Sequence, residues 1–226
     1  MIFEISEDLD FSLDYYSYDI ENIIDSDTQF VFDNFGNDPA VVVRFPSADP
    51  NDPGEVVRIF DSFQNIGDVE TTGIDFDLGY KLMSDVGEFK FDFVMNYVLK
   101  YEEFRPGSDG NKRLNLKEGQ FEQPEVRHTT SVNWNLEDIG VTLAINYIGE
   151  FEGDADSNFE DKTVDSMTTV DLVANYRGID NTTLTIGATN LLNEKPPFSH
   201  HEFVGYVQSV HSGQGRFMYL KGTYRF

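Results

Sequence analysis

One stretch of strict alternation limits this chain to a fold with unusually long β-strands. Between residues 89 and 101 every second side chain is apolar: Phe89, Phe91, Phe93, Met95, Tyr97, Leu99 and Tyr101. Such a strand has one apolar face and one more polar face. Thirteen residues at about 3.3 Å each, tilted by about 45°, cover roughly 30 Å, the thickness of a bilayer's hydrocarbon core. Strands of soluble proteins usually have about five or six residues, and neither Gly nor Pro interrupts this one.

The same period of two recurs along the chain, and no helical period competes with it. Alternating segments lie at residues 8–24, with a one-residue shift of phase after Tyr15 that we interpret as a β-bulge, and at residues 74–82, 132–136, 141–147, 170–176 and 184–188. Short connections at 84–87, 137–140 and 178–181 alternate with long polar connections at 25–54, 105–123, 152–164 and 191–214. We therefore predict an all-β fold, an antiparallel up-and-down transmembrane β-barrel segment of about eight long strands with short periplasmic turns and long outer loops. Aromatic residues near the strand ends, such as Trp134 and Phe151, fit the interfacial girdles of such barrels.

The chain ends in a strand whose last residue is aromatic. Leu220, Tyr224 and Phe226 share one face of it. This ending resembles the C-terminal strand of bacterial outer-membrane β-barrels, which closes the barrel and is read by the assembly machinery. We interpret these three residues as an assembly signal; the alternative is an ordinary sheet edge.

Composition excludes several classes of protein. A net charge of -25 and a pI near 4.2 repel phosphate backbones, so we expect no nucleic-acid partner. The chain has no Cys and therefore no disulfide framework. It lacks a run of 18 apolar residues, which excludes a membrane-spanning helix, while its mean hydropathy of -0.39 fits half-polar barrel strands. Residues 1–8 do not look like a signal peptide, so either one was removed or Met1 is not the natural start.

Three segments, together with the final strand, resemble the C-terminal barrel region of TonB-dependent outer-membrane receptors. They are residues 14–24, 65–76 and 188–197. Members of this family are 22-stranded barrels occluded by an N-terminal plug, and they use energy from an inner-membrane complex to import scarce ligands. The resemblance implies that residues 1–226 are a single partial domain, the C-terminal portion of such a barrel, with the plug and the N-terminal strands absent.

The resemblance also implies a location and partners. The location is the bacterial outer membrane. The partners are outer-membrane lipid, the barrel assembly machinery, the TonB complex through the missing plug, and a small-molecule or oligosaccharide ligand such as a siderophore complex. Which ligand is imported stays open.

We find no catalytic constellation, and we predict no enzyme, no cofactor and no metal. The four histidines are not joined by a nucleophile or a paired-carboxylate pattern. Residues 154–158 have the opening spacing of a calcium loop, but Phe159 and Lys162 argue against it. Because loops on a rigid barrel carry recognition, we expect ligand contacts from residues of the outer loops: Arg105, Lys112, Arg113, Phe198, His200, His201, Phe203 and Tyr206.

Two other interpretations remain open. The chain could be a self-contained eight-stranded outer-membrane barrel with a structural or adhesive role, or a secreted β-sandwich that binds carbohydrate. The mixture of acids, Asn, Thr and Lys at inward positions mildly favours the wall of a larger, wet barrel. A wall segment predicts that strand order follows the sequence and that residues 8–24 and 215–226 form the two edges, whereas a small closed barrel predicts that they pair.

Overall fold

The computed structural model describes residues 2–26, 28–106, 112–116, 123–153, 163–200 and 202–226. Its helix and strands are β1 (Ile2–Ser6), β2 (Leu9–Asp25), α1 (Thr28–Phe35), β3 (Val42–Arg44), β4 (Val56–Ile59), β5 (Gln64–Ser84), β6 (Gly87–Pro106), β7 (Lys112–Leu116), β8 (Val126–Leu136), β9 (Ile139–Ile148), β10 (Phe151–Glu152), β11 (Thr163–Val164), β12 (Met167–Ile179), β13 (Thr182–Thr189) and β14 (Phe217–Tyr224). Among these residues no helix has the length and apolar character to cross a membrane.

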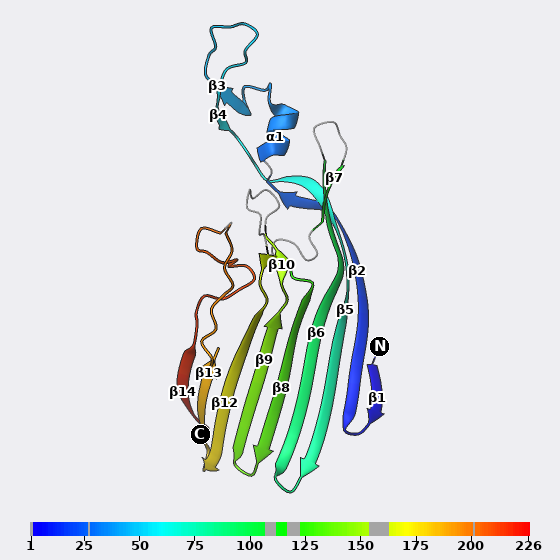
Figure 1. The fold of residues 1–226 in the computed structure, drawn as a ribbon, viewed down its shortest axis with the longest axis vertical. Helices are drawn as coiled ribbons and strands as arrows, with labels where there is room; N and C mark the ends of the chain where they lie inside the picture. The colour runs from blue at the N-terminus through cyan, green and yellow to red at the C-terminus, as the bar shows by residue number, and fades with distance from the viewer. Residues whose placement is uncertain (1, 27, 107–111, 117–122, 154–162, 201) are drawn as a thin grey trace. The chain divides into compact units, whose positions relative to one another are not determined.

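The long strands form one antiparallel sheet in which sequence neighbours are spatial neighbours (Figure 1). Its order is β1-β2-β5-β6-β8-β9-β12-β13-β14, with β7 paired to β6. The predicted all-β, up-and-down architecture is therefore confirmed. The prediction for the N-terminal edge is wrong, because Ile2–Ser6 pairs with β2 and forms the edge itself, outside residues 8–24. The C-terminal edge is β14, as predicted.

The chain divides into two compact units. The first comprises residues 1–16, 72–100 and 117–226, and the second comprises residues 17–71 and 101–116. The first unit contains β8 to β14 with their loops, and the second contains α1, β3, β4 and β7.

Tight turns join the long strands at one end of the sheet in the first unit, as the sequence predicts. They lie between β5 and β6, β8 and β9, and β12 and β13. Left-handed backbone occurs in all three, at Gly87 (φ 120°), Glu137 (φ 48°) and Asn181 (φ 55°). Gly and Asn adopt this conformation most readily, which explains where these strands reverse.

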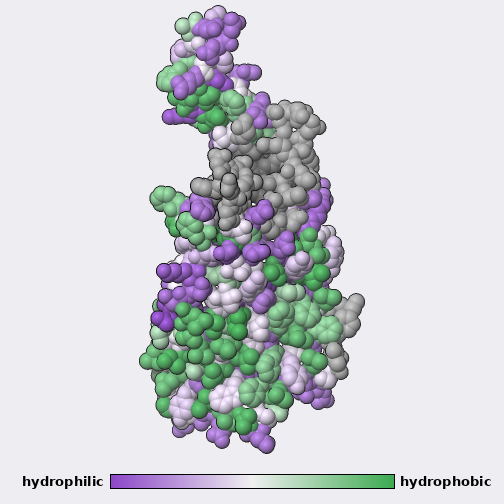
Figure 2. Space-filling model, in the orientation of Figure 1, coloured by the Kyte–Doolittle hydropathy of each residue, from purple (hydrophilic) through white to green (hydrophobic). Residues whose placement is uncertain are grey.

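One face of this sheet is apolar from strand to strand. A lateral row of paired residues crosses six strands: Phe91, Val132, Leu143, Leu172, Ala188 and Met218. The adjacent row holds Phe89, Trp134, Val141, Ala174, Ile186 and Leu220. Figure 2 shows apolar side chains gathered over these strands, with hydrophilic residues at the turn end. A continuous exposed apolar surface of this kind marks an interaction with a membrane or another apolar partner.

The second unit holds structure that periodicity did not indicate. The connection after β2 contains the helix α1 and the β3–β4 hairpin, with Val31 and Val42 buried. Arg44 stabilises this connection: its Nη1 donates to the carbonyl of Gly54 (2.9 Å), and its guanidinium lies 5.4 Å from the ring centre of Phe32. The helix was missed because eight residues give too short a pattern to separate from a loop.

Candidate functional site

Polar side chains of neighbouring strands hydrogen-bond to one another on the face opposite the apolar rows. Asn133 Nδ2 donates to Asp92 Oδ2 (3.3 Å), and Thr142 Oγ1 donates to Asn133 Oδ1 (2.7 Å). Asn146 Nδ2 donates to Asp171 Oδ2 (3.0 Å). Most of these groups are half-buried amides and hydroxyls, which satisfy one another and still accept water. This face therefore suits an aqueous lumen.

The same pattern continues at the β2 side of the first unit. Asn96 Nδ2 donates to Asp75 Oδ1 (2.8 Å) and to Tyr16 Oη (3.3 Å). Ser12 Oγ donates to Asp77 Oδ2 (3.2 Å). The division into two faces thus holds from β2 to β13.

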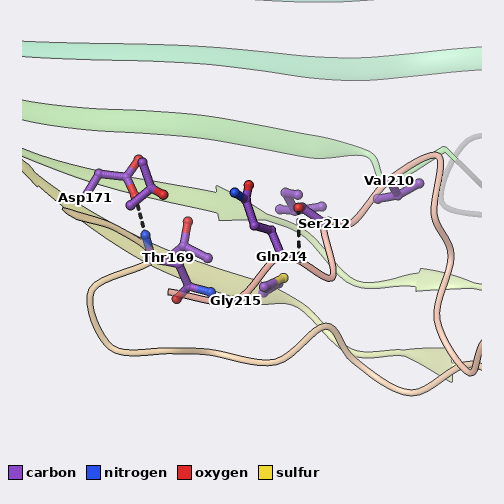
Figure 3. A pocket seen from close by; sticks show the side chains of 10 residues that line it. Thr169, Asp171, Val210, Ser212, Gln214 and Gly215 are labelled. Carbon is purple, nitrogen blue, oxygen red and sulfur yellow. Dashed lines mark hydrogen bonds between the residues drawn. The ribbon is translucent and has the colours of Figure 1, made fainter. Parts of the chain in front are cut away.

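A pocket of about 360 Å³ lies where the loop of residues 190–216 folds against this polar face (Figure 3). Thr169 and Asp171 of β12 line the pocket together with Ser212, Gln214 and Gly215 of the loop. The complete lining is Ile148, Met167, Thr169, Asp171, Thr189, Asn190, Val210, Ser212, Gln214 and Gly215. Hydroxyl, amide and apolar groups surround one carboxylate in this pocket.

Asp171 is held in place by the structure around it. Its Oδ1 accepts a hydrogen bond from the backbone N–H of Asn190 (2.7 Å), while its Oδ2 accepts from Asn146 Nδ2. A carboxylate with both oxygens engaged in this way is a fixed part of the pocket wall.

The loop of residues 190–216 is braced at both of its ends. Asn190 and Asn193 adopt left-handed backbone (φ 48° and 59°). Asn190 Oδ1 accepts from the N–H of Glu194, and Asn190 Nδ2 donates to the carbonyl of Glu194, both at 2.8 Å. Asn193 Oδ1 accepts from the N–H of Arg216 (3.0 Å), and Arg216 Nη1 donates to the carbonyl of Leu191 (3.3 Å). The Asn-rich segment therefore closes the base of the loop.

The middle of the same loop packs against the β10–β11 hairpin. Phe151 and Val164 of the hairpin and Val207 and Val210 of the loop form a buried apolar cluster, with Ile148 against it. A fully buried side chain of this size contributes about 1.5–3 kcal/mol. Phe151 is thus a core residue rather than a girdle aromatic, which corrects the interpretation made from its place in the sequence.

The structure places four predicted contact residues in the loop of residues 190–216. The rings of Phe198 and His200 meet edge to face at 4.8 Å, and both residues are exposed. Phe203 is fully exposed, whereas Tyr206 is half-buried beside Gly213. None of these four is among the residues that line the pocket. Their role in ligand contact stays a prediction.

Three further predicted contact residues, Arg105, Lys112 and Arg113, belong to the β6–β7 hairpin. The backbone of Arg105 pairs with that of Arg113 in the β6–β7 hairpin, and Lys112 pairs with Pro106. His201 lies outside the described residues, as do residues 154–162, which include the calcium-like spacing.

The pocket residues were missed by sequence reasoning. Asp171 and Thr169 looked like ordinary inward positions of one strand, and Gln214 like part of a polar loop. Their only signal was a lone acid on the polar face of β12, one strand before the Asn-rich segment that begins at Asn190.

Histidines of the described residues occupy apolar or exposed surroundings. On the apolar face, the ring of His128 stacks on that of Tyr147 (4.9 Å) and lies tilted against that of Phe93 (5.3 Å). No group of three or more His, Cys, Asp or Glu among the described residues is arranged to hold a metal.

Comparison with solved structures gives the same fold. The chain aligns with a mutant of the ferric enterobactin receptor PfeA from Pseudomonas aeruginosa, in complex with enterobactin, at 16% identity and a TM-score of 0.61, covering 97% of this chain and 29% of that one. The FrpB iron transporter from Neisseria meningitidis aligns at 13% identity and a TM-score of 0.61, covering 98% of this chain and 30% of that one. The siderophore receptor PirA from Acinetobacter baumannii aligns at 16% identity and a TM-score of 0.59, covering 98% of this chain and 30% of that one.

The alignments cover nearly all of this chain but only part of each solved structure. The chain spans less than a third of the length of these three proteins. No curated protein matches the chain closely enough to count as a relative. A family model described as TonB dependent receptor-like, beta-barrel matches residues 3–191, which is well over half of the sequence. The resemblance is therefore confirmed, and the chain belongs to the TonB-dependent receptor-like β-barrel family.

Proposed function

We propose that residues 1–226 are the C-terminal portion of the β-barrel of an outer-membrane receptor that takes up a scarce ligand with energy from the TonB complex. The observation that carries this proposal is the two-faced sheet. Its lateral rows of apolar residues fit lipid, and its hydrogen-bonded polar face fits a wet lumen. Family membership and the short share of the solved relatives that the chain covers support it.

The proposal includes partners and excludes chemistry on the ligand. Lipid would cover the apolar face, and the barrel assembly machinery would read Leu220, Tyr224 and Phe226 at the C-terminal strand. The TonB complex would act through a plug supplied by the rest of the receptor. Transport needs no bond to be made or broken, so the protein is not an enzyme, and its acidity argues against a nucleic-acid partner.

The ligand would be a small molecule such as a siderophore complex or an oligosaccharide. The solved relatives are named as receptors or transporters for ferric enterobactin, siderophores and iron. The pocket beside Asp171 and the exposed side chains of Phe198 and Phe203 are the parts of this chain that would contact a ligand.

The two alternatives are less well supported. A small closed barrel requires the two edges to pair, yet β1 and β14 lie at opposite ends of the strand order, and the described residues contain no ladder between them. A soluble sandwich requires a second sheet to cover the apolar face, and the two other sheets described have two short strands each.

Cysteine labelling in intact cells tests the location and the topology. Residues 1–226 contain no native Cys. With any Cys elsewhere in the complete receptor replaced by Ser, Ser209→Cys in a long loop and Asp138→Cys in a tight turn each carry a single thiol. We expect a membrane-impermeant maleimide to label position 209 in intact cells and position 138 only after the outer membrane is permeabilised. Equal labelling of both positions in intact cells would contradict the proposal.

Uptake by cells that express the complete receptor tests transport. Radiolabelled ferric siderophores, oligosaccharides and a vitamin would be offered in turn, with and without a protonophore that collapses the proton gradient. We expect one class to accumulate only while the gradient is present. Accumulation that does not depend on the gradient, or the absence of uptake across all classes, would count against a TonB-coupled receptor.

A further inference from the structure

His211 is a titratable side chain enclosed in an apolar environment. Only 4% of its surface is exposed, and its ring lies 5.9 Å from that of Phe151, nearly parallel to it. Neither Nδ1 nor Nε2 has a hydrogen-bond partner. The backbone N–H of His211 donates to the carbonyl of Val207 (2.9 Å), which fixes the residue in its turn of the loop. A neutral imidazole leaves one N–H donor and one acceptor nitrogen unpaired here, whereas an imidazolium would leave two N–H groups and a positive charge unpaired, which costs far more.

His211 lies where two long loops meet. Its own loop, residues 190–216, contributes Val207 and Val210 to the buried cluster, and the β10–β11 hairpin contributes Phe151 and Val164. The imidazole therefore shares the contact that joins the loop to the hairpin.

The neighbours of His211 in the chain form one wall of the pocket. Val210 and Ser212 flank it directly, and both line the pocket opposite Thr169 and Asp171 (Figure 3). If the loop leaves the hairpin, this wall leaves with it.

The charges around His211 do not favour its protonated form. Burial, followed by repulsion from the Arg127 guanidinium of β8, lowers the pKa of His211 below its ordinary value of 6.5. Glu150 before the hairpin, Glu152 within it and Asp165 after it are all exposed.

We propose that His211 is an acid-sensitive latch that holds the loop of residues 190–216 against the β10–β11 hairpin and, by doing so, keeps the pocket beside Asp171 in shape. Protonation occurs readily only when the loop has moved and water reaches the ring. Because the pKa of His211 is lowered in the closed loop, acid favours the open loop, starting as the pH falls below about 6.5 and growing until the closed-state pKa is passed. Above about pH 7.5 His211 is neutral in both the open and the closed loop, so its protonation no longer favours opening.

The latch itself requires only the two loops and the strands beneath them. Its consequence for a ligand, the loss of the pocket wall at low pH, rests on the proposed function. The test therefore measures loop position and not uptake, so a failure of the latch and a failure of the proposed function give different results.

Spin labels on the two loops report the latch directly. Glu152→Cys and Ser209→Cys are exposed positions on the hairpin and on the loop. Residues 1–226 contain no native Cys, and any Cys elsewhere in the complete protein is first replaced by Ser. In the complete protein reconstituted in lipid vesicles, we expect one narrow distance distribution at pH 8 and a longer or broader second population at pH 5, reversible on return to pH 8. A distribution that does not change between pH 8 and pH 5 would overturn the proposal.

Two substitutions of His211 identify the group that titrates. His211→Phe and His211→Leu keep an apolar side chain in the cluster and cannot be protonated, so both should keep the loop closed at pH 5. His200→Phe is the matched control in the same loop, because His200 is exposed, and it should open as the parent protein does. Opening that persists in both His211 variants would assign the effect to another group and overturn the latch.

A third variant covers the case in which neither His211 substitution folds. Arg127→Gln removes a positive charge that opposes protonation of the closed state. We expect a smaller open population at pH 5 than in the parent protein. An unchanged or larger open population would contradict the role given to His211.

Discussion

At the scale of single residues, glycines determine where aromatic side chains can lie on the polar face. A Cβ added to Gly73 would sit against the hydroxyl of Tyr16 and 2.7 Å from the backbone carbonyl oxygen of Tyr97. A Cβ on Gly187 would sit against the ring of Tyr219, which lies across from it on β14. Because these two positions have no side chain, a tyrosine ring can lie over the backbone there; a Cβ at either position would displace the ring.

Gly73→Ala should destabilise the folded protein by about 1–3 kcal/mol, because the backbone oxygen of Tyr97 cannot move aside cheaply. Gly187→Ala should cost less, since the Tyr219 ring can rotate. Reversible urea unfolding in lipid vesicles measures both free energies. Gly222→Ala is the matched control, because its nearest neighbour is 3.9 Å from the added Cβ, and it should be neutral or slightly stabilising. Equal costs at Gly73 and Gly222 would contradict the packing described here.

At the scale of elements, the strands and the loops depend on different interactions. A strand is defined by its ladder and by the alternation of its side chains, both of which repeat every two residues. The loop of residues 190–216 depends instead on a few specific contacts, chiefly the Asn190 and Asn193 hydrogen bonds at its base and the Val207 cluster at its middle. Loss of one such contact should affect the whole loop.

Asn190→Ala should lower the free energy of opening of the loop by about 1–3 kcal/mol. The substitution removes two hydrogen bonds to Glu194. It also places alanine, which adopts left-handed backbone less readily than asparagine, at a position with φ 48°. Asn190→Gly keeps the backbone freedom and loses only the hydrogen bonds, so it should cost less. Amide hydrogen exchange of residues 191–216 at pH 8 measures local opening. If exchange in Asn190→Ala matches that of the parent protein, the base of the loop is held by something else.

The sequence predicted the strands well because their evidence is periodic. The apolar parity of residues 89–101 and the turns near residues 84, 137 and 178 follow from local pattern alone, and the observed register agrees with them. The edge strand at Ile2–Ser6 and the helix at Thr28–Phe35 were missed because each is short.

The candidate site was largely hidden from the sequence for a different reason. Asp171 and Gln214 become neighbours of one pocket only when residues more than 40 positions apart fold together. The burial of His211 and Phe151 likewise depends on contact between two loops, and a side chain in a polar loop gives no local sign that it will be enclosed. Composition and the period of two therefore predict which side chains share a face of the sheet. They do not predict which side chains become enclosed, because enclosure depends on tertiary contacts between distant segments.

At the scale of the whole molecule, the sheet ends in two strands with unpaired outer edges among the described residues, β1 and β14. In lipid, each unpaired backbone group costs several kcal/mol, so a stable wall needs further strands at both edges. The C-terminal strand has a second role in the proposed assembly. Leu220, Tyr224 and Phe226 are exposed, and the rings of Tyr224 and Phe226 meet edge to face at 5.2 Å.

Deletion of Phe226 should reduce insertion into the outer membrane more than Phe198→Ala, because both remove an exposed aromatic ring but only Phe226 belongs to the proposed assembly signal. Heat-modifiable migration of the folded barrel, compared between the two variants at equal expression, measures the difference. Normal accumulation of folded barrel without Phe226 would show that the machinery does not read this residue.

The account depends most on its assignment of the two faces of the sheet, and spin-label accessibility along β6 tests that assignment directly. Single Cys substitutions from residue 89 to residue 99 would be labelled in the complete protein in lipid vesicles. Collisions with oxygen, which concentrates in lipid, should be high at the odd positions such as Phe91 and Phe93, and collisions with a water-soluble nickel chelate should be high at the even positions such as Asp92 and Asn96. An alternation of the opposite phase, or equal accessibility to both reagents along the strand, would contradict a membrane-spanning wall with a wet inner face.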